Sequence, residues 1–532
     1  MLDVLWGIGG MIALLAIAVL FSVDRRRIRI RTVALALTIQ VVFGVLVLYV
    51  PAGRAVLEAL TLAVQAVINS SSAGIDFLFG PVLPEEGSVF AFQVLPVIVF
   101  FAALTSVLYY LGALQWVVKI IGGGLAKLLG TTTPESMNAA ANIFVGQTEA
   151  PLVIRPYVAG MTRSELFAVM CGGLATVAGS VLVGYSLLGA PLEYLIAASF
   201  MAAPAALLMA KLLVPAGALE EARDEAPAGA SVRTSDDAAG PADSGHHAGA
   251  PAQTGSAKEE RRGAARWLAR GSRRGATSYA AVEFARREDA QGEDAQAAAR
   301  GDGVAARPDG AVRSDDAAQS GDAARPDDVA RSADPAGVSA TDAADGATGG
   351  ARGDAADEDT EPANVIDAAA RGASDGLSLA LNVGAMLIAF ISLIALINII
   401  LGAVGGLFGL EAITLEQLFG YVFAPVMFAV GVPWAEAIDA GSFLGQKLVL
   451  NEFVAFADFA PQIENYSPKT QAIVTFALTG FANFGSLAIL LGGLGGIAPS
   501  RRRDIARLGL RAVLGGTLAN LMSAAIAGML IG

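Results

Sequence analysis

The sequence predicts an all-α polytopic membrane protein with about eight transmembrane helices and two re-entrant helical hairpins in inverted repeats. Of its 532 residues, 54% are hydrophobic and only 16% are charged, and the mean hydropathy is +0.57. A soluble domain carries about 25% charged residues, so this composition excludes an ordinary soluble enzyme. Several apolar runs reach the roughly 20 residues that a helix needs to cross a bilayer, and two more apolar stretches carry polar residues in their middle.

Eight apolar runs predict spanning helices. The first, residues 4–22, has no basic segment before it and is followed by the basic stretch 24–31, which indicates an uncleaved span and not a signal peptide. A further segment, 114–129, is amphipathic and suits a helix lying in the membrane interface. The other spans are predicted at about 32–50, 90–112, 165–188, 190–214, 377–403, 469–496 and 507–531.

Two apolar stretches, 134–156 and 434–464, carry carboxylates, amides and glycines in their middle and are too polar to face lipid. Non-helical backbone at membrane depth is tolerated only inside protein or beside a water-filled cavity. We therefore predict a re-entrant helix–turn–helix hairpin in each stretch, called hairpin one and hairpin two. Each is followed by two spans, and inverted repeats with discontinuous helices near the midplane are typical of secondary transporters.

The distribution of Lys and Arg near the helix ends predicts the orientation. Most of these residues fall on one side if the N-terminus lies outside, with Arg54, Lys447 and Lys469 as the exceptions. Hairpin one then enters from the cytoplasm, and hairpin two enters from outside.

The net charge of −13 belongs to one segment. Residues 216–370 hold 30 acidic and 17 basic side chains, so the difference of −13 leaves the rest of the chain neutral. The part 216–362 is rich in Ala, Asp, Gly, Arg and Ser, and such a segment buries too little apolar surface to fold alone. We expect it to be an acidic, low-complexity, disordered cytoplasmic insert, acting either as a solvated linker or as a regulatory or partner-binding tail.

The expected organisation therefore has four parts. The first holds spans one to three; the second holds the interfacial helix, hairpin one and spans four and five; the third is the insert; and the fourth holds span six, hairpin two and spans seven and eight. Their boundaries are 1–112, 113–215, 216–362 and 363–532.

Hairpin one carries polar groups around a place where the helix must stop, because Gly146 and Pro151 bracket it. Gln147 offers amide donors and a carbonyl acceptor, a combination that matches the edge of a nucleobase. Glu149 brings a charge that needs a donor, a water or a cation. Hydrogen bonding between helices is the alternative role for both side chains.

Hairpin two and span seven carry a second polar group. The Glu452 carboxylate can accept hydrogen bonds from two sugar hydroxyls; alternatively, Lys447 could pair with a carboxylate. In span seven, Asn483 and Ser486 are predicted to share one helical face, and Phe481 on a neighbouring face can lie against a base or ribose. Hydrogen bonding between helices is again the alternative.

Span four contains Thr176 and Val177 among small residues. An exposed carbonyl at either residue, with the Thr176 hydroxyl, would suit a hard cation such as Na⁺. Close helix packing through the small residues is the alternative. Cys171 on the same span is expected to be a packed apolar residue, and as the lone cysteine it excludes a disulfide framework.

Four long motifs resemble the concentrative nucleoside transporter family. They are NIFVGQTEAPLVIRPY (142–157), ANVIDAAARGASDGLSLALNVGAMLIAF (363–390), GQKLVLNEF (445–453) and GFANFGSLAILLGGLGGIAP (480–499). The resemblance covers nearly all of the chain except the insert. It implies a homotrimer of eight-helix protomers, each with a scaffold part and a mobile transport part.

The resemblance also implies site roles, while Asn451 is assigned a neighbouring structural role. The base would be faced by Gln147, Thr148, Glu149 and Val181. The ribose would be bound by Glu452, Asn483 and Ser486, with Phe481 lining the pocket. The sodium site would use Asn142, Val145, Thr176 and Val177, partly through backbone carbonyls.

We therefore expect a cation-coupled nucleoside importer of the cytoplasmic membrane that works by alternating access. Na⁺ is the expected coupling ion, purine and/or pyrimidine nucleosides are the expected substrates, and neither catalytic residues nor a nucleic-acid partner is expected. Three alternatives stay open: a proton-coupled symporter in which Glu149 titrates, a membrane enzyme with Glu149 and Glu452 as acid and base, and a non-transporting scaffold whose insert carries the function.

Overall fold

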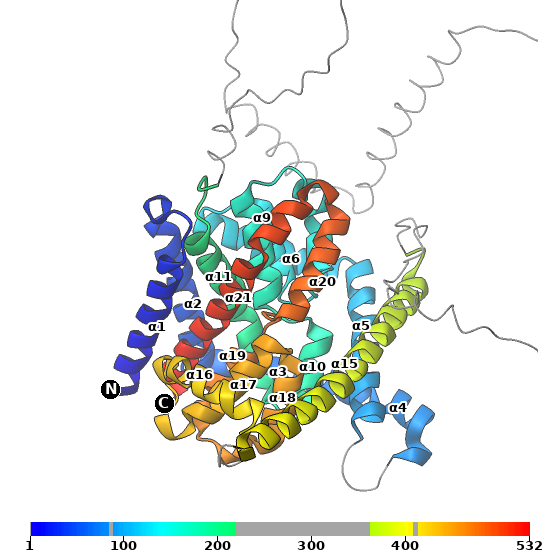
Figure 1. The fold of residues 1–532 in the computed structure, drawn as a ribbon. Helices are drawn as coiled ribbons and strands as arrows, with labels where there is room; N and C mark the ends of the chain where they lie inside the picture. The colour runs from blue at the N-terminus through cyan, green and yellow to red at the C-terminus, as the bar shows by residue number, and fades with distance from the viewer. Residues whose placement is uncertain (1, 84–88, 220–361, 408–412, 532) are drawn as a thin grey trace, which may run out of the picture. The chain divides into compact units, whose positions relative to one another are not determined.

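The computed structural model describes residues 2–83, 89–219, 362–407 and 413–531. Every regular element in these ranges is a helix (Figure 1), which confirms the predicted all-α fold. The predicted insert lies almost wholly outside the described residues.

The N-terminal part contains the first three predicted spans, α1 (Leu2–Leu20), α2 (Ile30–Leu48) and α5 (Phe90–Tyr110). Between α2 and α5 lies an apolar segment that the sequence analysis did not predict, formed by α3 (Pro51–Ser70) and α4 (Ser72–Phe79). Its mean hydropathy reaches only 1.3, against 2.1 to 2.2 in the three neighbouring spans. It is nevertheless long enough to cross a bilayer.

Hairpin one has the predicted helix–turn–helix form. The amphipathic α6 (Ala113–Leu129) precedes it, the first arm is α7 (Thr133–Ala141), and the second arm consists of η3 (Ala150–Ile154) and α8 (Arg155–Val158). The first arm begins with a capping box, formed by Thr132 before α7 and Glu135 in its first turn. The first arm ends at Ala141, before Gly146, where the sequence predicted that the helix must stop. A non-helical tip therefore separates the two arms.

Spans four and five follow hairpin one. Span four is not the continuous helix predicted for 165–188, because it consists of α9 (Arg163–Ala175) and α10 (Gly179–Leu187), separated by extended backbone at Thr176 and Ala178. The β-branched and small residues at this break give the backbone little reason to stay helical. Span five is α11 (Leu192–Leu213).

The second half begins with α15 (Val365–Leu407), which contains the predicted sixth span. The next helix, α16 (Leu415–Val430), was not predicted. It bends by 116° into the first arm of hairpin two, α17 (Trp434–Val449), and the second arm is α18 (Glu452–Phe459) followed by η4 (Ala460–Asn465).

Span seven is also broken, contrary to the continuous helix predicted for 469–496. It consists of α19 (Pro468–Leu478) and α20 (Phe484–Ile497), and the five residues between them are not helical. Gly480 lies in this break. The last span is α21 (Arg502–Ile531).

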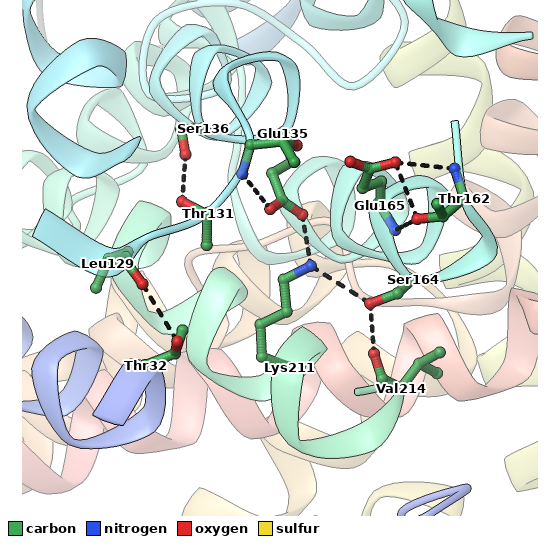
Figure 2. A network of polar contacts seen from close by, with 11 residues as sticks. Thr32, Leu129, Thr131, Glu135, Ser136, Thr162, Ser164, Glu165, Lys211 and Val214 are labelled. Atoms are coloured by element: carbon green, nitrogen blue, oxygen red, sulfur yellow. Dashed lines mark hydrogen bonds and ion pairs between the residues drawn. The ribbon is translucent and has the colours of Figure 1, made fainter. Parts of the chain in front are cut away.

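The two hairpins enter from opposite ends of the bundle. At one end, the Lys211 ammonium at the close of α11 contacts Glu135 Oε2 of hairpin one at 2.6 Å and Ser164 Oγ at 3.3 Å (Figure 2). At the other end, Ser467 Oγ donates to Glu436 Oε2 of hairpin two at 2.8 Å. The order helix, hairpin, broken span, unbroken span occurs twice, as α6–α11 and α16–α21, so the inverted repeat is confirmed.

The spans form an inner and an outer group. In span four, span five and α21, between 78% and 94% of the residues in the most apolar stretch are buried inside the chain. In α1, α2, α5 and α15 the same share is only 11–28%. The inner group therefore forms the core, and the outer group presents apolar side chains away from it. Cys171 on α9 is fully buried in this core, as expected.

Candidate functional site

The tips of both hairpins and the breaks in both discontinuous spans meet in the core of the bundle. The Gly179 N–H at the start of α10 donates to the Phe144 carbonyl of hairpin one at 3.1 Å. The Phe481 N–H in the second break donates to the Thr176 carbonyl in the first break, also at 3.1 Å. These contacts tie hairpin one, span four and span seven together through backbone that the helices leave unpaired.

Glu452 is the most highly bonded carboxylate at this crossing. It begins α18 of hairpin two and is 5% exposed. Asn483 Nδ2 donates to its Oε2 at 2.8 Å, and the Tyr185 hydroxyl donates to its Oε1 at 2.9 Å. A buried carboxylate needs such donors, and lone pairs on both oxygens stay available for sugar hydroxyls.

Tyr185 is a site residue that the sequence analysis did not identify. It is fully buried on α10, and its ring stacks on that of Phe456 with a centroid distance of 4.4 Å. Its position offered a signal, because it lies four residues after Val181, on the same helical face. A tyrosine inside a spanning helix also needs a partner for its hydroxyl.

Asn483 and Ser486 do not share a helical face as predicted, because Asn483 precedes the helix. It is the N-cap of α20, with φ −143° and ψ 171°, and its Oδ1 accepts from the Ser486 N–H at 2.6 Å. Asn451 does the same for α18, where its Oδ1 accepts from the Val454 N–H at 2.8 Å. Two short helices therefore begin at the crossing with asparagine caps, and half-helix N-termini favour electron-rich ligands.

Gln147 at the tip of hairpin one has an unused acceptor. The side chain is 5% exposed, and its Oε1 is buried without a hydrogen-bond partner among the described residues. It packs closely on α9, because a Cβ on Gly173 would lie 2.9 Å from Gln147 Cβ. A buried acceptor left unpaired costs about 1–3 kcal/mol, so this amide is suited to a ligand donor.

Thr148, Val181 and Glu149, the other residues predicted to face the base, each have a protein contact or a buried position of their own. Thr148 packs against Gly493 of α20, and Val181 is buried on α10. Glu149 Oε2 accepts from the Gly146 N–H and closes the turn at the hairpin tip. Glu149 also lines a cavity of about 290 Å³ shared with Asp375 of α15, and no contact joins it to Glu452.

Phe481 is partly buried in the break of span seven. Its backbone is held by the bond to span four, while its ring makes no aromatic contact within the described part of the chain. A half-covered ring without an aromatic partner is free to lie against a planar base or the apolar face of a sugar.

Two of the four predicted cation-binding residues, Asn142 and Thr176, lie against the same residue, Gly172 of α9. Asn142 is fully buried; its Nδ2 donates to the Asn138 carbonyl at 2.9 Å, whereas its Oδ1 has no partner among the described residues. Thr176 Oγ1 donates to the Gly172 carbonyl at 2.8 Å, which leaves the hydroxyl oxygen able to accept. An unpaired amide oxygen and a threonine hydroxyl oxygen are the donor set that a hard cation prefers.

Lys447 does not pair with a carboxylate, which was the alternative considered for hairpin two. Its ammonium donates to the Ala477 carbonyl at 2.6 Å and to Asn520 Oδ1 at 2.8 Å. Both partners are uncharged.

Comparisons with known proteins agree with this geometry. The chain matches three family profiles: "Na+ dependent nucleoside transporter C-terminus" over residues 335–528, "Na+ dependent nucleoside transporter N-terminus" over 9–82, and "Gate: Nucleoside recognition" over 91–192. Among solved structures, it is similar to CNTnw in an inward-facing substrate-bound state, with a TM-score of 0.71 and 42% identity over 99% of this chain and 98% of that one. An outward-facing variant of CNTnw also gives a TM-score of 0.71, with 41% identity over 100% and 98% of the two chains.

Relatives in sequence point the same way. The uncharacterized transporter YutK of Bacillus subtilis is 46% identical, and the match covers 100% of both chains. The nucleoside permease NupC of Helicobacter pylori is 37% identical over 99% of this chain and 98% of its own. These proteins are named as transporters and permeases, so the prediction that the chain is not an enzyme is confirmed. The chain is a multi-pass membrane protein that belongs to the concentrative nucleoside transporter family.

Proposed function

We propose that this chain imports purine and/or pyrimidine nucleosides across the cytoplasmic membrane, coupled to Na⁺, by alternating access. The observation that carries the proposal is the Glu452 carboxylate, held by Asn483 and Tyr185 where the two hairpins and the two breaks meet. A carboxylate fixed in this way accepts hydrogen bonds from sugar hydroxyls. The unpaired Gln147 Oε1 then accepts a donor from the base.

Sodium is cargo in this mechanism and binds before the nucleoside. The unpaired Asn142 Oδ1 and the carbonyls of Val145, Thr176 and Val177 supply oxygen ligands, so a bound ion joins hairpin one to the first break. This fixes Gln147 and its neighbours at the hairpin tip, and the nucleoside then bridges both hairpins. Ion and nucleoside bind better together than separately, which is the requirement for coupled transport. Low internal sodium releases the ion, and the nucleoside follows.

The basic end of the bundle is proposed to face the cytoplasm. The N–H of Val23, beside the arginines 25–27, donates to the Leu213 carbonyl at 2.9 Å, and Arg163 pairs with Asp504 at 3.0 Å, so basic segments far apart in sequence lie at one end. Two of the three exceptions, Lys469 and Lys447, have local explanations, while Arg54 stays an exception. Lys469 pairs with Asp3 at 2.6 Å, and Lys447 is buried in the core. The positive-inside rule then places the N-terminus outside.

Three copies are proposed to form the working assembly, and the four-part organisation with boundaries at 112, 215 and 362 is proposed with it. Helix α15 supports an assembly of several copies, because only 11% of the residues in its most apolar stretch are buried within one chain. A face of this kind contacts either lipid or a second copy. Native mass spectrometry in detergent with added lipid measures the copy number, and a monomer throughout would contradict the trimer.

Radiolabelled uridine and adenosine uptake into proteoliposomes tests the function. We expect accumulation with an inward sodium gradient and its loss when choline replaces external sodium at fixed pH. Accumulation that persists in choline and follows an inward proton gradient would contradict sodium coupling and support the proton-coupled alternative, for which Glu149 and Asp375 on one cavity wall are the candidate carboxylates. Liposomes without protein are the control.

A further inference from the structure

The core of the bundle contains a second buried lysine whose surroundings differ from those of Lys211. The Lys211 ammonium lies at the basic end of the bundle and pairs with the Glu135 carboxylate (Figure 2). The Lys447 ammonium, near the end of the first arm of hairpin two, is fully buried and makes no ion pair within the described part of the chain. A buried ammonium needs hydrogen bonds from elsewhere, and here two neutral oxygens accept them.

One of these oxygens is the Ala477 carbonyl, in the last turn of α19. The last carbonyls of a helix have no partner within the helix and carry the negative end of its dipole. A cation is therefore stabilised at this position. Lys447 supplies that cation from hairpin two, so the charge is fixed in the protein and is not taken up from solution.

The second oxygen belongs to Asn520 of α21, which is 2% exposed. Its Nδ2 donates to the Ala175 carbonyl at 2.7 Å and to the Thr479 carbonyl at 2.7 Å, while its Oδ1 accepts from Lys447. Ala175 is the last residue of α9, and Thr479 directly follows α19. A single amide thus bonds the carbonyls at which both discontinuous spans stop being helical.

The Asn520 amide fits between the helices because residue 480 is a glycine. A Cβ on Gly480 would lie 2.2 Å from Asn520 Oδ1, closer than side chains approach one another. Gly480 follows Thr479 in the break, so the absence of a side chain there lets α21 reach both breaks.

We infer that Asn520 and Lys447 form a positioning pair that transmits the state of the break in span four to the break in span seven. This inference rests on the proposed function. Residue 176, proposed to bind sodium, directly follows Ala175, and Asn483, proposed to bind ribose, lies four residues after Thr479. Ordering of the first break by a bound cation fixes the Ala175 carbonyl. Asn520 then holds the second break in the geometry that presents Asn483 to Glu452.

The test is the effect of sodium on nucleoside affinity in the purified full-length protein. Uridine affinity is measured by calorimetry in sodium and in choline, and the ratio of the two affinities is the coupling. Asn520→Asp keeps the volume and the acceptor for Lys447 but removes both amide donors, whereas Asn520→Ala removes all three bonds. Ser523→Ala is the matched control, because Ser523 is buried on the same helix but bonds Gln40 of α2.

We expect both Asn520 variants to lose about tenfold or more of the ratio, within the usual size of coupling between two sites, while the affinity in choline stays near that of the parent. Ser523→Ala should keep the parental ratio. An unchanged ratio in a folded Asn520 variant, or an equal loss of affinity in sodium and in choline, would overturn the inference. If Asn520→Ala does not assemble, Asn520→Asp and Lys447→Gln decide by the same measurement. If the parent protein binds uridine with equal affinity in sodium and in choline, that result contradicts the proposed function and not this inference.

Discussion

At the scale of single residues, Glu452 illustrates how a buried carboxylate is prepared for a neutral ligand. Each of its oxygens already accepts one hydrogen bond from a protein side chain, and the two donors come from different spans. The carboxylate is therefore oriented before a sugar arrives. These two donors offset the cost of burying the charge, and each oxygen keeps a lone pair that can accept a further hydrogen bond.

Replacing this carboxylate by an amide is the sharpest test of its role. In Glu452→Gln, an NH₂ group takes the place of one acceptor and faces either Asn483 Nδ2 or the Tyr185 hydroxyl. We expect uridine affinity to fall about 10- to 100-fold, because hydrogen bonds to a charged group contribute about 1.5–3 kcal/mol. Calorimetry in sodium measures the change.

The control for this variant is Glu416→Gln, which alters a carboxylate in the first turn of α16 that accepts hydrogen bonds from Asn398 of α15. It should keep the parental affinity. Parental uptake kinetics in Glu452→Gln, with assembly intact, would contradict the ribose-binding role.

Tyr185 affects the same carboxylate more weakly. Tyr185→Phe removes the hydroxyl that donates to Glu452 Oε1 but keeps the ring that stacks on Phe456. We expect uridine affinity to fall by about 1 kcal/mol, roughly fivefold. Tyr466→Phe, which removes a hydroxyl near Gln462 at 3.3 Å, is the control. Equal effects of the two variants on uptake KM would argue against a positioning role for Tyr185.

At the scale of elements, the breaks in spans four and seven carry the architecture of the site. The positions of the hairpins followed from the sequence, because carboxylates, amides and glycines in an apolar stretch cannot face lipid. The two breaks could not be predicted from the sequence, because the residues around Thr176 and Asn483 are apolar enough to indicate continuous spanning helices. What interrupts those helices is tertiary: Asn520, from a helix distant in sequence, bonds the carbonyls that the interruptions release.

The burial of individual polar residues was predictable where their composition sets them apart, while their roles stay predictions. Gln147 and Glu452 stand out as polar groups in apolar surroundings, Asn142 was named only through the family resemblance, and all three are buried. Tyr185 was missed because composition alone does not single out an aromatic residue in a spanning helix; its spacing of four from Val181 was the available signal. The pairing of Asn483 with Ser486 was predicted at the right spacing but with the wrong geometry, since a cap also joins residues three apart.

A glycine pair in span seven tests the importance of the second break. Gly480→Ala would force its Cβ to 2.2 Å from Asn520, whereas Gly492→Ala places a methyl group where no atom lies within 4 Å. We expect Gly480→Ala to lose about 1–3 kcal/mol of stability through overpacking, together with uridine affinity, and Gly492→Ala to behave like the parent. Thermal unfolding followed by tryptophan fluorescence and calorimetric binding measure both effects. Equal behaviour of the two variants would show that the break tolerates a side chain.

At the scale of the whole molecule, every proposed ligand-binding residue lies in the helical parts on either side of the insert. Residues 220–361 lie outside the described residues, and their composition predicts a solvated segment. Replacing them by a Gly/Ser linker of about 20 residues, with an end-to-end distance of roughly 25 Å, should preserve sodium-driven uptake. A scrambled insert of equal length and composition is the control. Loss of uptake in a linker variant that still assembles would assign the insert an active role.

The enclosure of Cys171 gives the molecule an experimental advantage. It is the lone cysteine of the chain and is fully buried, so the natural protein presents no thiol to a bulky maleimide. Single cysteines introduced at exposed residues at the two ends therefore report sidedness without background. An impermeant maleimide should label Asn465→Cys on intact cells, and Ser500→Cys only after the cells are opened. The same silent background allows paired spin labels on hairpin two and α15 to record how far one travels against the other during a transport cycle.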